Sequence, residues 1–245
     1  MLALGGLWAG AEDKAVSPPG GSILGRVSWE DAIPESRKWE VDGGNAKGCT
    51  CPEGRKHVKP DESLVVDPET KGVAHAVVWL KGVKGGPVLG PVEIDQKGCV
   101  FAPHVALVSV GQKVKVLNPE GIVHNFHLYS QQVSSDEQNI TMAKFKKWIE
   151  VPKGGFAKPE FIRTVCDIHA WMGGWIAVME NGYAARTDAK GAFRIEGVPP
   201  GKYTLALWHE PLTPEGRPIL MEKGILIEAG EVVDAPFFLK AEAKP

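Results

Sequence analysis

Residues 165–179 read Val-Cys-Asp-Ile-His-Ala-Trp-Met-Gly-Gly-Trp-Ile-Ala-Val-Met, and this stretch decides what the chain can be. Cys166, His169 and Met172 follow one another with two residues in each gap, between an apolar run that ends at Cys166 and one that starts at Trp175. Short apolar runs bounded by Asp or Gly predict two strands with a loop between them. A thiolate, an imidazole and a thioether are the donors that select copper. The stretch therefore predicts a copper-binding loop.

A trigonal copper site with a long axial Met needs a second imidazole from elsewhere in the chain. Residues 118–127, Asn-Pro-Glu-Gly-Ile-Val-His-Asn-Phe-His, offer His124 at the start of a strand that follows a turn. His127 lies three residues further on, so strand alternation turns it to the opposite face and we expect it outside a shared site. The sequence lacks the repeated HxH pairs of multicopper oxidases. The loop also holds one thiolate, whereas a binuclear copper centre needs two.

These two segments resemble the cupredoxins, the small blue-copper proteins such as plastocyanin and amicyanin, over roughly residues 96–180. In that family the first His ligand follows an Asn-containing turn and precedes Asn, as His124-Asn125 does here, and the spacing of the ligand loop is similar to that of amicyanin. The resemblance implies one type 1 copper per chain, with Asn125 holding the two ligand segments together by hydrogen bonds near the thiolate. The ligands that it implies are His124, Cys166, His169 and Met172.

The rest of the chain predicts an all-β protein. The 29 glycines and 19 prolines together make up about a fifth of the 245 residues, against roughly 12% in an average chain. The short apolar runs, several with period-two alternation, predict strands. They are Ile23–Trp29, Ala74–Leu80, Lys113–Leu117, Val123–Leu128, Ile162–Cys166, Trp175–Met179, Ala192–Ile195, Tyr203–Trp208 and Ile225–Ile227. A helical turn is expected only at Asn139–Trp148.

The last part of the chain has a pattern of its own, TDxxGxFxIxxVPPGKYTL, over residues 187–205. Asp188 and Gly191 predict a turn with positive φ at the glycine. The pattern resembles the carboxypeptidase-regulatory, transthyretin-like β-sandwich modules, and the wider chain resembles bacterial proteins labelled methylamine-utilisation-like. These resemblances imply a Greek-key cupredoxin sandwich followed by a smaller transthyretin-like sandwich. The expected units are residues 1–20 (signal remnant and linker), 21–180 (copper domain, with its core at 96–180 and an N-terminal elaboration at 21–95) and 181–245.

The chain has four cysteines, and the three outside the ligand loop leave two interpretations open. The favoured interpretation is a disulfide between Cys99 and either Cys49 or Cys51, since exported cysteines tend to pair. The alternative is a second metal site, because a CxC pair with nearby histidines holds Cu(I) or Zn. Its ligands would be Cys49, Cys51 and Cys99 with His57, His75 or His104.

Charge and apolar patterning limit the class of protein. The chain has 28 Lys and Arg residues against 30 Asp and Glu residues, which gives a net charge of −2. This balance argues against a nucleic-acid binder, since such proteins carry a basic patch or stripe. No stretch approaches the ~20 apolar residues of a membrane span. Met1–Ala11 is uncharged, and Ala9-Gly10-Ala11 has the small-x-small form of a signal-peptidase site. We therefore expect an exported protein, periplasmic or extracellular.

The favoured function is single-electron transfer with a redox partner protein that the sequence does not identify, and not catalysis. Two alternatives remain: a copper carrier or storage protein, and a structural cell-envelope β-protein without a redox role. Lys144, Lys146 and Lys147 surround Phe145 and Trp148, and would steer an acidic partner unless they form an ordinary solvated face.

Overall fold

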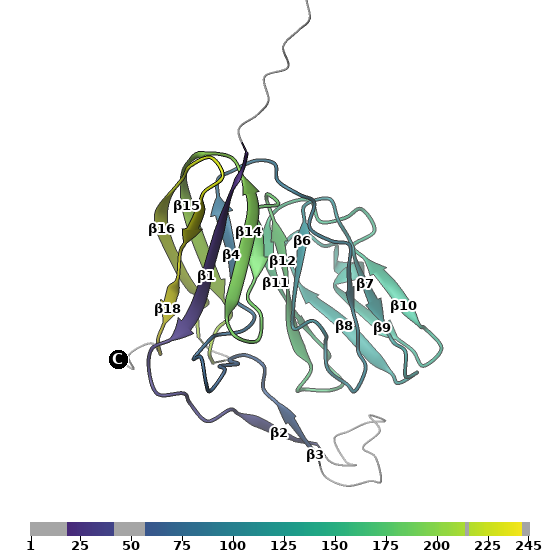
Figure 1. Ribbon diagram of the computed structural model, residues 1–245. Helices are drawn as coiled ribbons and strands as arrows, with labels where there is room; N and C mark the ends of the chain where they lie inside the picture. Colours follow the sequence, from purple (N-terminus) through teal and green to yellow (C-terminus); the bar gives the residue numbers. More distant parts are fainter. Residues whose placement is uncertain (1–18, 42–56, 214–215, 242–245) are drawn as a thin grey trace, which may run out of the picture.

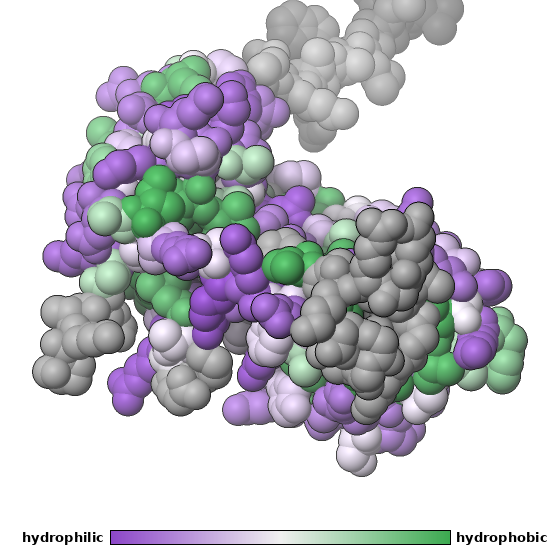
Figure 2. Space-filling model, turned by 90° about the horizontal axis from the view of Figure 1, so that it is seen from below, coloured by the Kyte–Doolittle hydropathy of each residue, from purple (hydrophilic) through white to green (hydrophobic). Residues whose placement is uncertain are grey.

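The computed structural model describes residues 19–41, 57–213 and 216–241, and it confirms the all-β prediction. Two β-sandwiches lie side by side (Figure 1), and seen from below they form two lobes with hydrophilic residues prominent between them (Figure 2). Within the described ranges the only helix is the single turn α1 (Ser135–Gln138). The expected helical turn at Asn139–Trp148 was wrong, since its ends belong to two strands. No helix in the described part of the chain is long and apolar enough to cross a membrane.

Sandwich A contains the predicted ligand segments and consists of two sheets. The larger sheet has the order β6 (Val105–Ser109), β12 (Gly173–Met179), β11 (Glu160–Val165), β8 (His124–Tyr129) and β9 (Asn139–Met142). The smaller sheet has the order β10 (Trp148–Val151), β7 (Val114–Leu117) and β5 (Val92–Ile94). Inward residues of both sheets, such as Phe126, Val116 and Ile176, are fully buried in one shared core. The period-two alternation of β7 follows from this one-sided burial.

Sandwich B also has two sheets. In one sheet β1 (Gly21–Trp29) lies between β14 (Ala192–Val198) and β17 (Val232–Asp234), and it also pairs with β18 (Phe237–Leu239). The other sheet has the order β13 (Ala184–Arg186), β4 (Val77–Lys81), β15 (Gly201–His209) and β16 (Ile219–Ile227). Apolar residues from both sheets, including Ile23, Leu80 and Leu207, form its core.

The expected domain boundary needs correction. We expected residues 21–95 to elaborate the copper domain and residues 181–245 to fold as a separate sandwich. Instead, β1 pairs with β14, and β4 lies between β13 and β15. Each of these two N-terminal strands completes a sheet of sandwich B, because its ladder of backbone hydrogen bonds is made with strands from the far end of the chain. The chain therefore starts sandwich B, crosses to sandwich A and returns.

The turn predicted at residues 187–191 has the expected backbone. Gly191 has φ +74°, and a Cβ added there would lie 2.4 Å from the carbonyl oxygen of Val27. Asp188 Oδ1 accepts hydrogen bonds from the backbone N–H groups of Lys190 and Ala192. Glycine is thus required twice, for its positive φ and for the close approach of β1.

The two sandwiches meet through a small third core. Trp208 of β15 is 2% exposed and stacks on Phe161 of β11, with ring centroids 4.4 Å apart. Below this junction, β2 (Lys38–Val41) and β3 (His57–Pro60) form a two-stranded arm (Figure 1). Val41 at the end of β2 is buried in the core of sandwich A. The arm therefore lies against the end of sandwich A that carries the ligand loop.

Candidate metal centre

The sheet order of sandwich A brings the predicted ligand segments together. His124 is the first residue of β8, and Cys166 directly follows β11, which pairs with β8. His169 and Met172 lie in the loop between Cys166 and β12. The order of the strands thus places one histidine and one ligand loop at the same end of one sheet.

Three donor atoms converge at this end. His124 Nδ1 lies 3.1 Å from His169 Nδ1, and Cys166 Sγ lies 3.5 Å from His169 Nδ1 and 3.9 Å from His124 Nδ1. All three side chains are buried, with exposed fractions of at most 1%. A triangle with these sides has its centre about 2.0 Å from each corner, and metal bonds to imidazole nitrogen and thiolate sulfur are about 2.0–2.3 Å long. The arrangement therefore fits one trigonal metal ion.

The ligand loop is tightly wound by its own backbone. The N–H of His169 donates to the carbonyl of Cys166, and the N–H of Met172 donates to the carbonyl of His169. The N–H of Cys166 in turn donates to the carbonyl of Met172 at 3.1 Å. The Met172 side chain is 1% exposed and packs in the core of sandwich A, so its thioether is shielded from water.

Burial sets the protonation of the donors when no metal is bound. Burial, together with the smaller effect of the neighbouring His169, lowers the pKa of His124 to about 4, so the imidazole is neutral and its lone pair is available. Burial raises the pKa of the Cys166 thiol, while backbone hydrogen bonds from Asn125, Ile168 and His169 act in the opposite direction and favour the thiolate. Metal binding must therefore release the thiol proton.

Asn125 links the two ligand segments. Its Oδ1 accepts from the N–H of Asp167, and its Nδ2 donates to the carboxylate of Asp167, both at 2.8 Å. Asn139 also donates to this carboxylate. Although burial raises the pKa of Asp167, the hydrogen bonds from Asn139, Asn125 and His127 hold it below its usual range. His127 lies on the outer side, 3.0 Å from Asp167 and stacked on Tyr129, away from the three converging donors.

Cys99 is the residue near the site that the motif did not reveal. Its sulfur lies within 4.8 Å of donor atoms of His124 and His169, and its carbonyl accepts from the indole N–H of Trp171. Cys99 is disulfide-bonded, so it offers no thiolate, and Cys166 is the free thiol at the site. Cys49 and Cys51 lie outside the described residues, so the identity of the partner remains a prediction.

The alternative second metal site is only partly within the described residues. Cys49, Cys51 and the side chain of His57 lie outside them. His75 and His104 lie close together, with ring centroids 5.1 Å apart, but Nε2 of His104 pairs with the carboxylate of Glu210. These two histidines therefore belong to a polar cluster at the junction of the sandwiches. No local motif in the sequence links Glu210 to His104.

Comparison with known proteins gives partial matches. The family described as polysaccharide lyase family 4, domain II, matches residues 148–235, which is less than half of the chain. This match corrects the expected transthyretin-like module, because the matching model is of another family and begins within sandwich A. Comparison with curated proteins finds no match.

Among solved structures, the chain is similar to copper proteins. A reduced Cu(I) form of an amicyanin variant is 22% identical over 37% of this chain and 83% of that chain, with a TM-score of 0.31. A copper-containing nitrite reductase from Thermus scotoductus SA-01 is 24% identical over 37% of this chain and 23% of that chain, with a TM-score of 0.30. A purple cupredoxin from Nitrosopumilus maritimus is 16% identical over 36% of this chain and all of that chain, with a TM-score of 0.28. The case for a metal site therefore rests on the residue geometry.

Proposed function

We propose that this chain is an exported type 1 copper protein that carries single electrons between redox partners and turns over no substrate. The convergence of Cys166, His124 and His169 around a point at metal-bond distance carries the proposal. One cysteine sulfur and two imidazole nitrogens in a buried trigonal set, with a methionine in the same loop, are the ligand types of blue-copper electron-transfer sites. The similarity to amicyanin and other cupredoxins agrees with this assignment.

When bound, copper supplies a one-electron couple between Cu(II) and Cu(I). The chain itself keeps the donors in place: Asn125 ties β8 to the ligand loop, and the backbone hydrogen bonds of the loop fix His169 and Met172. The apolar core around Cys166 excludes water, and Met172 would serve as the weak fourth donor that tunes the potential. Rigid donors suit electron transfer because little rearrangement then accompanies each change of oxidation state.

The redox partner would dock near the ligand end of sandwich A, at the lysine loop (residues 143–148). This loop follows β9, whose Met142 pairs with His124. Phe145 at its tip is 84% exposed and lies between Lys144, Lys146 and Lys147. An exposed aromatic ring among cations fits a partner with an acidic surface, because opposite charges steer the encounter.

The experiment that tests this function separates electron transfer from copper delivery. Voltammetry of the copper-loaded chain should give one reversible one-electron wave, and Cu(I) should stay bound against a competing Cu(I) chelator. Irreversible loss of Cu(I) to the chelator within minutes would favour a carrier that hands copper to another protein. Absence of stoichiometric copper binding would favour a structural role.

A further inference from the structure

A cavity of about 360 Å³ lies where the ligand loop, the arm and the end of β15 meet. Small-molecule sites are typically roughly 300–1,000 Å³ in volume and combine apolar walls with a few polar groups. The cavity contains both kinds of group. We name it the junction cavity, and its key residues are Trp39, Glu62, Phe101, His104, Trp171 and Glu210.

The polar end of the cavity has an unsatisfied atom. His104 is 6% exposed, and its Nε2 is held by Glu210, whose other carboxylate oxygen accepts from the indole N–H of Trp175 at 2.8 Å. The Nδ1 atom of His104 is buried without a hydrogen-bond partner. It lies 3.8 Å from Glu62 Oε2, which is beyond hydrogen-bond length. Buried polar groups are nearly always hydrogen-bonded, so this gap is suited to a ligand atom.

A hydroxyl group can bridge His104 Nδ1 and Glu62 Oε2. An oxygen with hydrogen bonds of about 2.8 Å to both atoms spans a separation of this size. It can donate its one proton to the Glu62 carboxylate while it accepts a hydrogen bond from the Nδ1–H of the protonated His104 ring, whose Nε2–H faces Glu210. An anionic ligand would be repelled by Glu62 and Glu210, and an ammonium group has no lone pair to accept a hydrogen bond. A neutral hydroxyl is the group that satisfies both partners.

The walls of the cavity select what carries the hydroxyl. Phe101 is buried at the base, Trp171 comes from the ligand loop, and Trp39 of the arm is 41% exposed at the edge. Aromatic side chains favour the face or edge of a flat ring. We propose that the junction cavity binds a small phenol, with its ring among Trp39, Phe101 and Trp171 and its hydroxyl between His104 Nδ1 and Glu62. This goes beyond electron transfer and requires no bound metal.

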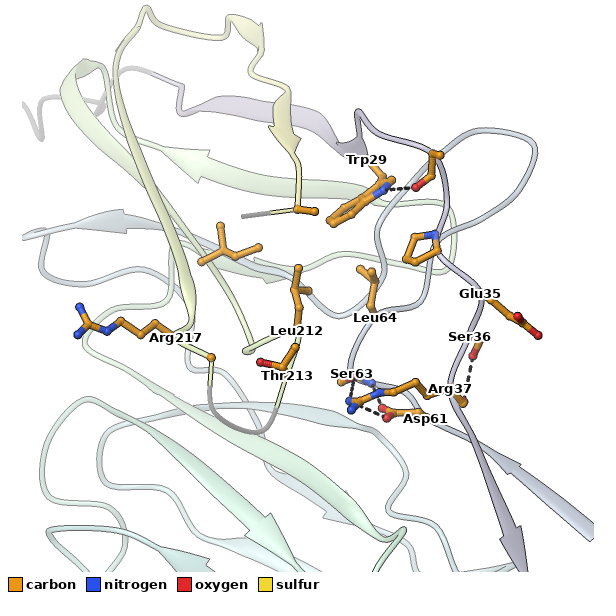
Figure 3. Close-up of a pocket in the computed structure, with 15 residues that line it drawn as sticks. Trp29, Glu35, Ser36, Arg37, Asp61, Ser63, Leu64, Leu212, Thr213 and Arg217 are labelled. Atoms are coloured by element: carbon orange, nitrogen blue, oxygen red, sulfur yellow. Dashed lines mark hydrogen bonds and ion pairs between the residues drawn. The ribbon is translucent and has the colours of Figure 1, made fainter. Parts of the chain in front are cut away.

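A neighbouring larger cavity, of about 490 Å³, differs from the junction cavity in its polar groups (Figure 3). Its walls include Trp29 and Leu212, and Arg37 in its lining contacts Asp61 at 2.9 Å and Ser63 at 3.5 Å. Among the described residues, none of those that line it has a buried side-chain polar atom without a hydrogen-bond partner. Glu35 at its rim points away from the cavity in Figure 3, which makes Glu35 a suitable control position.

The test is calorimetric titration of the metal-free full-length chain with 4-ethylphenol and with 4-ethyltoluene, which has nearly the same shape but no hydroxyl. We expect one site per chain and an affinity at least tenfold higher for the phenol. His104→Phe would leave Glu210 buried without its partner and endanger folding, so the variant is Glu62→Ala, at a side chain that is 33% exposed. It should weaken phenol binding at least tenfold, whereas Glu35→Ala should change the affinity less than twofold.

The place where the phenol binds is determined by NMR. The indole N–H of Trp175 donates to Glu210, so its resonance should shift when 4-ethylphenol is added. Equal affinity for both compounds, no saturable binding, or unchanged binding by Glu62→Ala would overturn the proposal. Because the chain is metal-free, none of these results bears on copper, and the absorption spectrum of the Cu(II)-loaded chain tests the proposed function separately.

Discussion

Individual side chains of the ligand segments were accessible to sequence reasoning, but their surroundings were not. The spacing of Cys166, His169 and Met172 reflects a single loop, so donor chemistry and the resemblance to cupredoxins both pointed to them. His124 was found because a strand start after a turn is a local feature. The approach of Cys99 and the pairing of His104 with Glu210 depend on contacts between distant segments. No spacing in the sequence records such contacts.

The first prediction concerns Asn125. Asn125→Ala removes the acceptor of the Asp167 N–H and the donor to its carboxylate. We expect the free energy of unfolding of the metal-free chain to fall by about 2 kcal/mol, because a partly buried N–H loses its partner. Denaturant unfolding followed by circular dichroism measures this. A loss below about 0.5 kcal/mol would mean that Asn125 does not hold the two segments together.

Strands were predictable wherever the apolar pattern was strong, and the strands that the sequence did not predict were missed for identifiable reasons. Every apolar run predicted as a strand overlaps one in the structure. Residues 105–109 were missed because an unbroken apolar run has no period to read. Asn139–Met142 became an edge strand through its pairing with β8, although its composition suggested a helical turn. Tertiary pairing decided in that case.

The element-scale prediction concerns the turn between β13 and β14. Gly191→Ala should be far more costly than Gly197→Ala, although both glycines have positive φ, +74° and +67°. A Cβ at Gly191 would lie 2.4 Å from the Val27 carbonyl oxygen, whereas at Gly197 nothing lies within 4 Å. We expect about 1 kcal/mol for the strain alone at Gly197.

The cost at Gly191 should exceed this by at least about 2 kcal/mol, because β1 must move to relieve the clash. The two variants are compared by their denaturant midpoints at a common slope. Equal costs would mean that β1 does not pack against this turn.

At the scale of the whole molecule, the sequence could not show how the sandwiches share the chain. The two N-terminal strands complete sandwich B, so each sheet of sandwich B has strands on both sides of the boundary expected at residue 181, although sandwich A ends there. The period-two pattern of a strand tells which face is buried but not which sheet it joins. The junction residues Trp208 and Phe161 are likewise apolar positions whose partners lie in the other sandwich.

The polar contact at this junction predicts a pH dependence. Burial lowers the pKa of His104, but the hydrogen bond and charge of Glu210, with the charge of Glu62, raise it above its usual value overall. Stability from a raised histidine pKa is fully present below about 6.5, the unfolded value, and is lost as pH rises through the folded value.

The wild type should therefore exceed Glu210→Gln in unfolding free energy most below pH ~6.5, and this difference should shrink at higher pH. Urea unfolding at a series of pH values from about 5.5 to 9 tests this. A difference that stays constant across the series would contradict the charged pairing of His104 with Glu210.

If electrons enter at the lysine loop, the rate at which a small reductant reduces the Cu(II)-loaded chain should depend on the charge of the reductant. Reduction of the Cu(II)-loaded chain by hexacyanoferrate(II), an anion, should slow several-fold when Lys144, Lys146 and Lys147 are all changed to Glu, because local attraction becomes repulsion. Reduction by the cationic hexaammineruthenium(II) should speed up instead, and high salt should remove both effects. Stopped-flow absorption measures both rates. Equal rates for the two proteins with both reagents would place electron entry away from this loop.

The most direct test of the central claim is the visible absorption and electron paramagnetic resonance spectrum of the chain loaded with Cu(II). The account predicts an intense thiolate-to-copper band with narrow copper hyperfine splitting at one copper per chain. Cys166→Ser should abolish the band. A weak tetragonal Cu(II) spectrum, or an intense band that persists in Cys166→Ser, would contradict a type 1 site built on Cys166, His124 and His169.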